Sequence, residues 1–152
     1  MKNLLVLFVI CLFPHLSGAA ETQTKKELNA EVKIWCKTHI DAFNTANYDK
    51  VKATYHFPCS VLNGDEVKMV TADGPPLVDF AEVKATGWAY SKIRKIRVLS
   101  VGSTRAMVSM TFSRVNGKEE ELLTTTSFLG LTKVDGKWGL KTLFLADDIT
   151  LD

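Results

Sequence analysis

Residues 41–64, DAFNTANYDKVKATYHFPCSVLNG, decide the fold, because they predict the end of one helix, a second short helix and the start of a β-hairpin. Asn47 is a typical N-cap for a helix from Tyr48 to about Tyr55, and Pro58 prevents that helix from continuing. The Asn63-Gly64 pair lies between two apolar runs, which is a strong signal for a hairpin turn. This stretch therefore predicts a helix-to-sheet transition.

The segments on either side extend this pattern. Apolar residues recur at intervals of three and four over residues 25–44 and again over residues 77–87, which predicts two further amphipathic helices. Alternating apolar segments bounded by Gly and Asn turns predict the strands. The expected strands are residues 59–62, 67–71, 96–101, 106–112, 121–128 and 138–144. The sequence thus predicts one α+β domain of three helices and six strands.

This order of elements resembles the nuclear transport factor 2-like superfamily, which includes ketosteroid isomerase-like and SnoaL-like proteins. The resemblance spans residues 25–147 and is carried by the Asn47-Tyr48-Asp49 turn, the Asn63-Gly64 and Asp135-Gly136 hairpins and the strand start at Lys137-Trp138. It implies a cone-shaped α+β barrel, with three helices packed on a curved, mostly antiparallel six-stranded sheet around a pocket. It also implies a homodimer through the sheet face, although the Thr124–Thr126 hydroxyls suit a solvated strand equally well.

The first twenty residues are typical of a secretory signal peptide. Lys2 precedes an apolar run, residues 4–13, that has about half the length of a membrane-spanning helix, and the small residues SGAA follow at 17–20. We therefore expect cleavage near Ala20, one domain over residues 21–152, and a secreted or periplasmic protein without a membrane anchor.

Charge and metal-ligand spacing exclude several classes of function. A net charge of +2 gives no support to nucleic-acid binding, and the basic run Lys92–Arg97 is interleaved with isoleucine as on the solvent side of a strand. Cys36 and Cys59 would either form a disulfide or remain two packed thiols, and both alternatives stay open. His39 and His56 lack a second ligand at metal-binding spacing, so neither a metal nor another cofactor is expected.

An internal pocket in this fold would combine aromatic walls with a few polar groups. His39 lies on the apolar stripe of the first helix, either as such a polar group or as a core residue satisfied by one partner. For the ketosteroid isomerase branch, the resemblance places the base at Asn63, which cannot abstract a proton, and the two donors at His39 and near Ser127. The candidate pocket residues are Trp35, His39, Tyr55, Phe57, Trp88, Tyr90, Phe112 and Ser127.

Two arginines bear on the limonene-epoxide-hydrolase-like branch, which would need an Asp-Arg-Asp arrangement inside the cone. Arg105 and Arg114 are nine residues apart, so their side chains point to opposite faces of a regular strand. Neither has an acidic residue two positions away on its strand. We expect both arginines to lie on the exterior.

These observations predict a small-molecule-binding domain with an apolar internal pocket and no evident catalytic set. The first alternative is an isomerase, dehydratase or hydrolase that uses His39 as acid or base. The second is a dimerisation module whose pocket has collapsed. The expected partners are a small apolar molecule and a second copy of the chain, and neither nucleic acid nor a membrane is expected.

Overall fold

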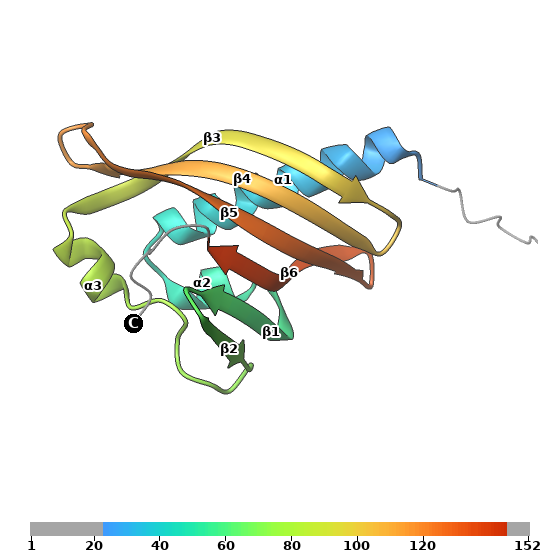
Figure 1. Cartoon of the computed structure of the whole chain (residues 1–152), viewed down its shortest axis with the longest axis horizontal. Coiled ribbons are helices and arrows are strands. Elements are labelled where there is room, and N and C mark those ends of the chain that lie inside the picture. The colour runs from blue at the N-terminus through green and yellow to red at the C-terminus, as the bar shows by residue number, and fades with distance from the viewer. Residues whose placement is uncertain (1–22, 146–152) are drawn as a thin grey trace, which may run out of the picture.

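The computed structural model describes residues 23–145, and the predicted signal peptide lies outside the described residues. The elements along the chain are α1 (Lys25–Asn44), α2 (Tyr48–Lys52), β1 (Tyr55–Asn63), β2 (Glu66–Val70), α3 (Phe80–Ala85), β3 (Trp88–Val101), β4 (Arg105–Asn116), β5 (Glu121–Val134) and β6 (Lys137–Leu145) (Figure 1). The predicted α+β class, with three helices and six strands, is confirmed. No helix within residues 23–145 is long and apolar enough to cross a membrane.

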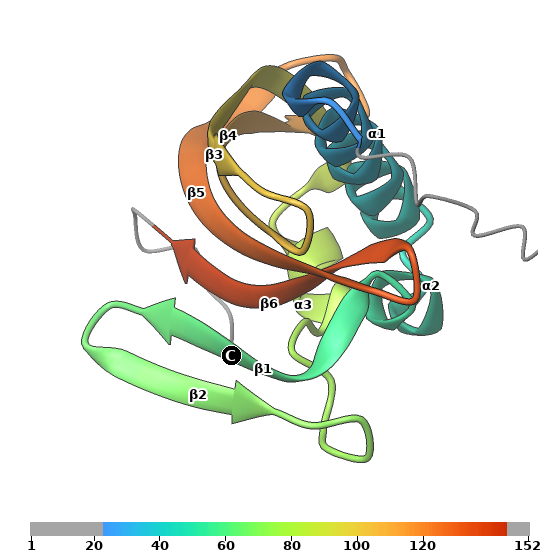
Figure 2. The same ribbon diagram turned by 90° about the vertical axis from the view of Figure 1, so that its right-hand side faces the viewer.

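The six strands form one curved sheet in the order β2-β1-β6-β5-β4-β3. All neighbouring strands are antiparallel except β1 and β6, which are parallel. The long strands bend around α1, while the β1–β2 hairpin extends the opposite edge (Figure 2). Because β2 and β3 are both edge strands, the sheet is an open cone rather than a closed barrel.

The inner face of the sheet carries a continuous apolar row. Val61, Leu143, Leu129, Val108 and Val98 are successive cross-strand partners from β1 to β3. Full burial of a large aliphatic side chain contributes about 2 kcal/mol, and Val61, Leu129 and Val108 are each at most 1% exposed, so this row is a major source of stability. The row faces α1 across the core. The apolar stripe of α1 consists of Leu28, Val32, Trp35, Cys36 and Ile40.

The helix boundaries differ from the predicted ones in two places. Asn47 caps α2 as expected, with its Oδ1 accepting from the Lys50 amide at 3.3 Å, but the helix ends at Lys52 and Tyr55 opens β1. The third helix begins only at Phe80, because Asp79 caps it. The residues before that cap, Leu77 and Val78, are buried in the core instead of forming a first helical turn.

One carboxylate ties α1 to the far end of the sheet. Glu31 Oε2 accepts from Lys133 Nζ at 2.7 Å and from Trp138 Nε1 at 2.9 Å, and its Oε1 accepts from Gln23 Nε2 at 2.6 Å. These donors, led by Lys133, lower the pKa of Glu31 to about 2. The Lys133 side chain is only 11% exposed, and Glu31 is its ion-pair partner.

Replacing this carboxylate should weaken the domain and flatten its response to acid. A carboxyl pKa of about 2 in the folded state, against 4.5 in the unfolded chain, gives stability that is present above pH 4.5 and is lost as the pH falls toward 2. Because the Glu31 side chain is 32% exposed, solvent screening reduces this contribution to about 1–2 kcal/mol. Urea unfolding of Glu31→Gln at neutral pH should show that loss.

The matched control is Glu82→Gln, on the exposed face of α3, which should change the free energy of unfolding little. If the Glu31→Gln variant kept the wild-type pH dependence below pH 4.5, the Glu31 contacts would not be the source of that dependence.

Candidate functional site

A cavity lies between α1 and the inner face of the sheet. Its volume is about 60 Å³, measured for the centres of water-sized molecules. Since one water needs roughly 10–15 Å³ on this measure, the cavity holds a few waters or a ligand with few non-hydrogen atoms. The lining is mainly apolar, and five residues bring polar groups to it: His39, Tyr55, Ser91, Arg114 and Ser127.

The structure brings four of the eight candidate pocket residues to this cavity, namely His39, Tyr55, Phe112 and Ser127. They come from α1, β1, β4 and β5. Met110 and Phe112 follow each other at alternate positions on β4, and Ser127 is the cross-strand partner of Met110. The curvature of the sheet therefore joins residues that are up to 88 positions apart in the chain.

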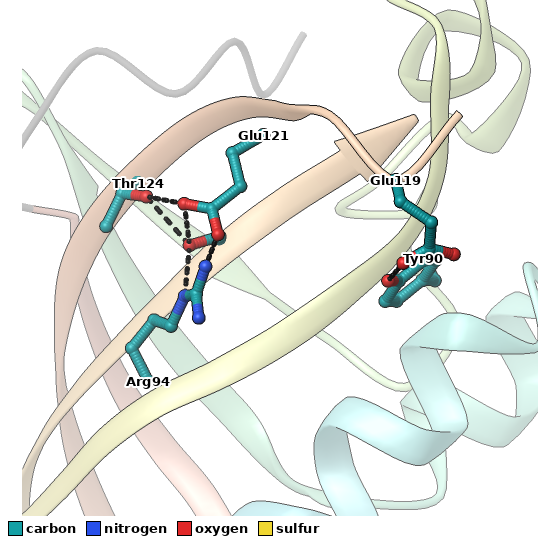
Figure 3. Close-up of polar contacts among 6 residues, drawn as sticks. Tyr90, Arg94, Glu119, Glu121 and Thr124 are labelled. Carbon is teal, nitrogen blue, oxygen red and sulfur yellow. Dashed lines mark hydrogen bonds and ion pairs between the residues drawn. The ribbon is translucent and has the colours of Figure 1, made fainter. Parts of the chain in front are cut away.

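The other four candidates lie outside the lining. Trp35 stacks behind His39, with ring centroids 5.1 Å apart and an interplanar angle of 6°, and Phe57 packs edge-on against Tyr55 at 5.8 Å. Trp88 packs against Phe43 at the end of the helix. Tyr90 instead donates a hydrogen bond to the exposed Glu119 carboxylate, on the β4–β5 turn (Figure 3).

Arg114 corrects the expectation that both arginines lie on the exterior. Arg105 is exposed, whereas Arg114 is only 7% exposed and lines the cavity. The opposite orientation of the two side chains, expected from their spacing, holds in β4. The expectation was wrong because it required an acidic partner on the same strand, whereas Arg114 is buried although no ion pair within residues 23–145 includes it.

A hydrogen-bond relay fixes the tautomer of His39. His39 Nδ1 lies 2.8 Å from Thr54 Oγ1, and that hydroxyl donates its proton to the Val51 carbonyl oxygen at 2.6 Å. Thr54 Oγ1 must therefore accept from His39, which assigns the ring proton to Nδ1 and leaves a lone pair on Nε2. Burial lowers the pKa of His39 to about 4, so the imidazole is neutral at physiological pH.

The end of α1 is fastened to β3 by one side-chain amide. Asn44 Nδ2 donates to the Ser91 carbonyl oxygen at 2.9 Å, and Asn44 Oδ1 accepts from the Ser91 amide at 2.7 Å. Ser91 Oγ accepts from Trp88 Nε1 at 3.0 Å, which leaves its own hydroxyl proton free to donate. Ser91 is also the cross-strand partner of Arg114, so this contact positions two of the polar groups of the cavity.

A separate polar cluster occupies the outer face of the same strands. Arg94 forms an ion pair with Glu121 (Figure 3). Arg94 Nε also donates to Ser113 Oγ at 2.9 Å. Ser113 Oγ also lies 2.7 Å from Thr124 Oγ1, its cross-strand partner. Since Ser113 precedes Arg114, the two side chains point to opposite faces, and the Glu121 carboxylate is held away from the cavity.

The cysteines and histidines form no metal centre in the described part of the chain. Cys36 and Cys59 are both buried and free, and burial raises the pKa of Cys36 to about 12 and that of Cys59 in the same direction. Both thiols are therefore packing groups rather than reactive ones. No group of three His, Cys, Asp or Glu side chains that could hold a metal ion occurs within residues 23–145.

Comparison with known proteins identifies the fold. A putative scytalone dehydratase from Novosphingobium aromaticivorans is similar at 16% identity, with a TM-score of 0.58, over 84% of this chain and 93% of that one. A putative ketosteroid isomerase from Shewanella frigidimarina is similar at 13% identity, with a TM-score of 0.56. The match covers 78% of this chain and 97% of that one. A nuclear transport factor 2-like protein of unknown function from Shewanella oneidensis is similar at 17% identity, with a TM-score of 0.55. The match covers 78% of this chain and 98% of that one.

These similarities confirm the predicted fold. The chain has the cone-shaped α+β fold of the nuclear transport factor 2-like superfamily. No family model matches the sequence, and no curated protein matches it. The chemistry of the site must therefore be argued from the residues of this chain.

The partly buried imidazole of His39 should make the domain sensitive to mild acid. With a folded pKa of about 4 and an unfolded value of 6.5, His39 takes up a proton more readily in the unfolded chain, so stability is highest above pH 6.5 and falls as the pH drops toward 4. The full shift corresponds to about 3 kcal/mol. In His39→Asn the amide can still donate to Thr54, and the slope between pH 6.5 and 4.5 should largely disappear from urea unfolding curves. An unchanged slope would mean that another group carries this sensitivity.

Proposed function

We propose that the chain is a secreted or periplasmic small-molecule-binding domain whose site is the cavity between α1 and the sheet. The observation that carries the proposal is the composition of the lining, in which apolar walls surround a few convergent polar groups from separate elements. Ligand sites typically have this composition. The neutral imidazole of His39 adds a hydrogen-bond acceptor at Nε2 that a ligand can use.

Binding fits the site better than acid–base catalysis does. An imidazole whose pKa is about 4 has no extra proton to donate at neutral pH and is a weak base. None of the residues described as lining the cavity is an aspartate or a glutamate. The position that the isomerase resemblance assigns to the base is Asn63, whose amide does not take up a proton at neutral pH.

The size of the cavity limits the affinity to be expected. Very small ligands gain at most about 1.5 kcal/mol per non-hydrogen atom, and most gain far less. A ligand of about six such atoms therefore binds with a dissociation constant in the micromolar to millimolar range. Four-carbon compounds are suitable probes, and NMR titration detects binding in this range.

Filling the cavity should abolish binding without unfolding the domain. In ¹H–¹⁵N NMR titrations with n-butanol, butyramide and butyrate, at least one probe should shift the signals of Met110, Ser127 and Leu129. Ser127 is buried and lines the cavity, so Ser127→Leu places a larger side chain in the ligand space and should remove these shifts.

The matched control is Thr126→Leu on the outer face of the same strand, where Thr126 Oγ1 lies 2.9 Å from Thr111 Oγ1. This variant should bind the probes as the wild type does. Absence of any shift at the lining residues of the wild type would overturn the proposal.

The outer face of the sheet supports the expected homodimer. Val67, Leu62, Phe144 and Phe128 are successive cross-strand partners from β2 to β5, and we call them the outer apolar row. Phe128 and Phe144 pack edge to face at 5.9 Å, yet they remain 39% and 40% exposed. Such a row is typical of a surface that packs on another protein, and we propose a second copy of the chain as the partner.

A charged side chain in the outer apolar row should dissociate the proposed dimer. Phe144→Lys would bury an ammonium group at the dimer interface, and the cost of desolvating it should shift sedimentation equilibrium to the monomer. Because Phe144 is partly exposed, the melting temperature measured at low concentration should change little. Ile34→Lys, at an exposed site on α1, is the control and should leave the dimer intact. A monomeric wild type would contradict this proposal.

A further inference from the structure

Arg114 is a buried cation with no compensating anion within residues 23–145. Its side chain belongs to the cavity lining and is only 7% exposed. Its Nε has no hydrogen-bond partner, and no ion pair within residues 23–145 includes it. An unpaired charge in the interior is strongly destabilising, so a buried arginine with no partner in the described part of the fold needs an explanation outside it.

The nearby carboxylate of Glu121 does not pair with Arg114. Glu121, at the start of β5, pairs with Arg94 on the outer face and is joined there to Ser113 and Thr124 (Figure 3). Ser113 and Arg114 are neighbours in β4, yet their side chains face opposite sides of the sheet. The guanidinium group is therefore left available within the cavity.

The surroundings of Arg114 suit an anion with an apolar body. Met110 and Phe112 lie on the same face of β4, and they form part of the apolar wall. Ser91, the cross-strand partner of Arg114, has a hydroxyl proton that no contact within residues 23–145 uses. The His39 ring is neutral at physiological pH, so it offers no second positive charge to an anion in the cavity. Among the described residues, the lining thus carries one positive charge and no negative one.

We propose that the cavity binds a small monocarboxylate with an apolar tail, and that Arg114 is the group that recognises the carboxylate. Its planar guanidinium can donate two parallel hydrogen bonds to the two carboxylate oxygens, and the Ser91 hydroxyl can donate a third. The tail then packs along Met110 and Phe112. This assignment rests on the proposed function and adds the chemical class of its ligand.

The test compares isosteric probes on the full chain. By isothermal titration calorimetry and NMR, the wild type should bind butyrate at least about tenfold more tightly than the neutral butyramide, because only butyrate forms the charge-assisted pair. Arg114→Met keeps a long unbranched side chain but removes the charge, and the preference should fall to about one. Arg105→Met makes the same change at the exposed arginine of β4 and should leave the preference unchanged.

The outcomes separate the two proposals. Equal binding of butyrate and butyramide by the wild type, with shifts at Ser127, would overturn the carboxylate assignment and leave the binding function intact; binding of no probe would overturn both. The comparison in the wild type stands even if Arg114→Met fails to fold. In that case Arg114→Lys, which keeps the charge without the planar fork, should show a reduced preference for butyrate that remains above one.

The aspartates of the C-terminal segment are an alternative source of the anion for Arg114. Asp147, Asp148 and Asp152 lie in the C-terminal segment outside the described residues. The triple variant Asp147→Asn, Asp148→Asn, Asp152→Asn should bind butyrate as the wild type does. Binding by that variant alone, with none by the wild type, would assign Arg114 to the chain's own carboxylates and overturn the proposal.

Discussion

Burial of the inner sheet face against α1 is the interaction on which the remaining structure depends. The sheet bends because one twisted layer must cover a helix that it meets on one side only. Glu31 fixes the first half of that helix to β5 and β6, and Asn44 fixes its last residue to β3. Between these two contacts the apolar stripe is interrupted by the imidazole of His39, and the cavity lies there. The cavity therefore results from incomplete packing between the helix and a curved sheet.

Much of the fold could be predicted from local chemistry. Asn47 as a cap, the Asn63-Gly64 and Asp135-Gly136 turns and the alternation in β4 and β5 each reflect interactions within a few residues. The boundaries at residues 52–55 and 77–80 were set by tertiary packing, because Tyr55, Leu77 and Val78 are buried where helical periodicity alone would place them in helices. Local patterns carry no information about such contacts.

The site was less predictable than the fold. Sequence pattern indicated that His39, Tyr55, Phe112 and Ser127 are inward-facing, but an aromatic ring in a core and one at a cavity have the same local signature, as Trp35 and Trp88 illustrate. Arg114 was missed, although its spacing from Arg105 already required the two side chains to face opposite sides of the strand. The apolar residues Ala106, Val108, Met110 and Phe112 alternate along the inner face of β4, and Arg114 continues that alternation. The signal that Arg114 faces inward was therefore local.

The open cone leaves β3 as an edge, with unpaired backbone groups along one side. Such an edge is a template for strand addition by other chains, which leads to aggregation. Lys92, Arg94, Lys95 and Arg97 are all exposed along it, and the pairing with β4 is broken by three register irregularities. The charges of Lys92, Lys95 and Arg97 and the uneven strand oppose docking of another β-strand. An exposed basic run on an edge strand is one of the features by which open sheets oppose edge-to-edge pairing.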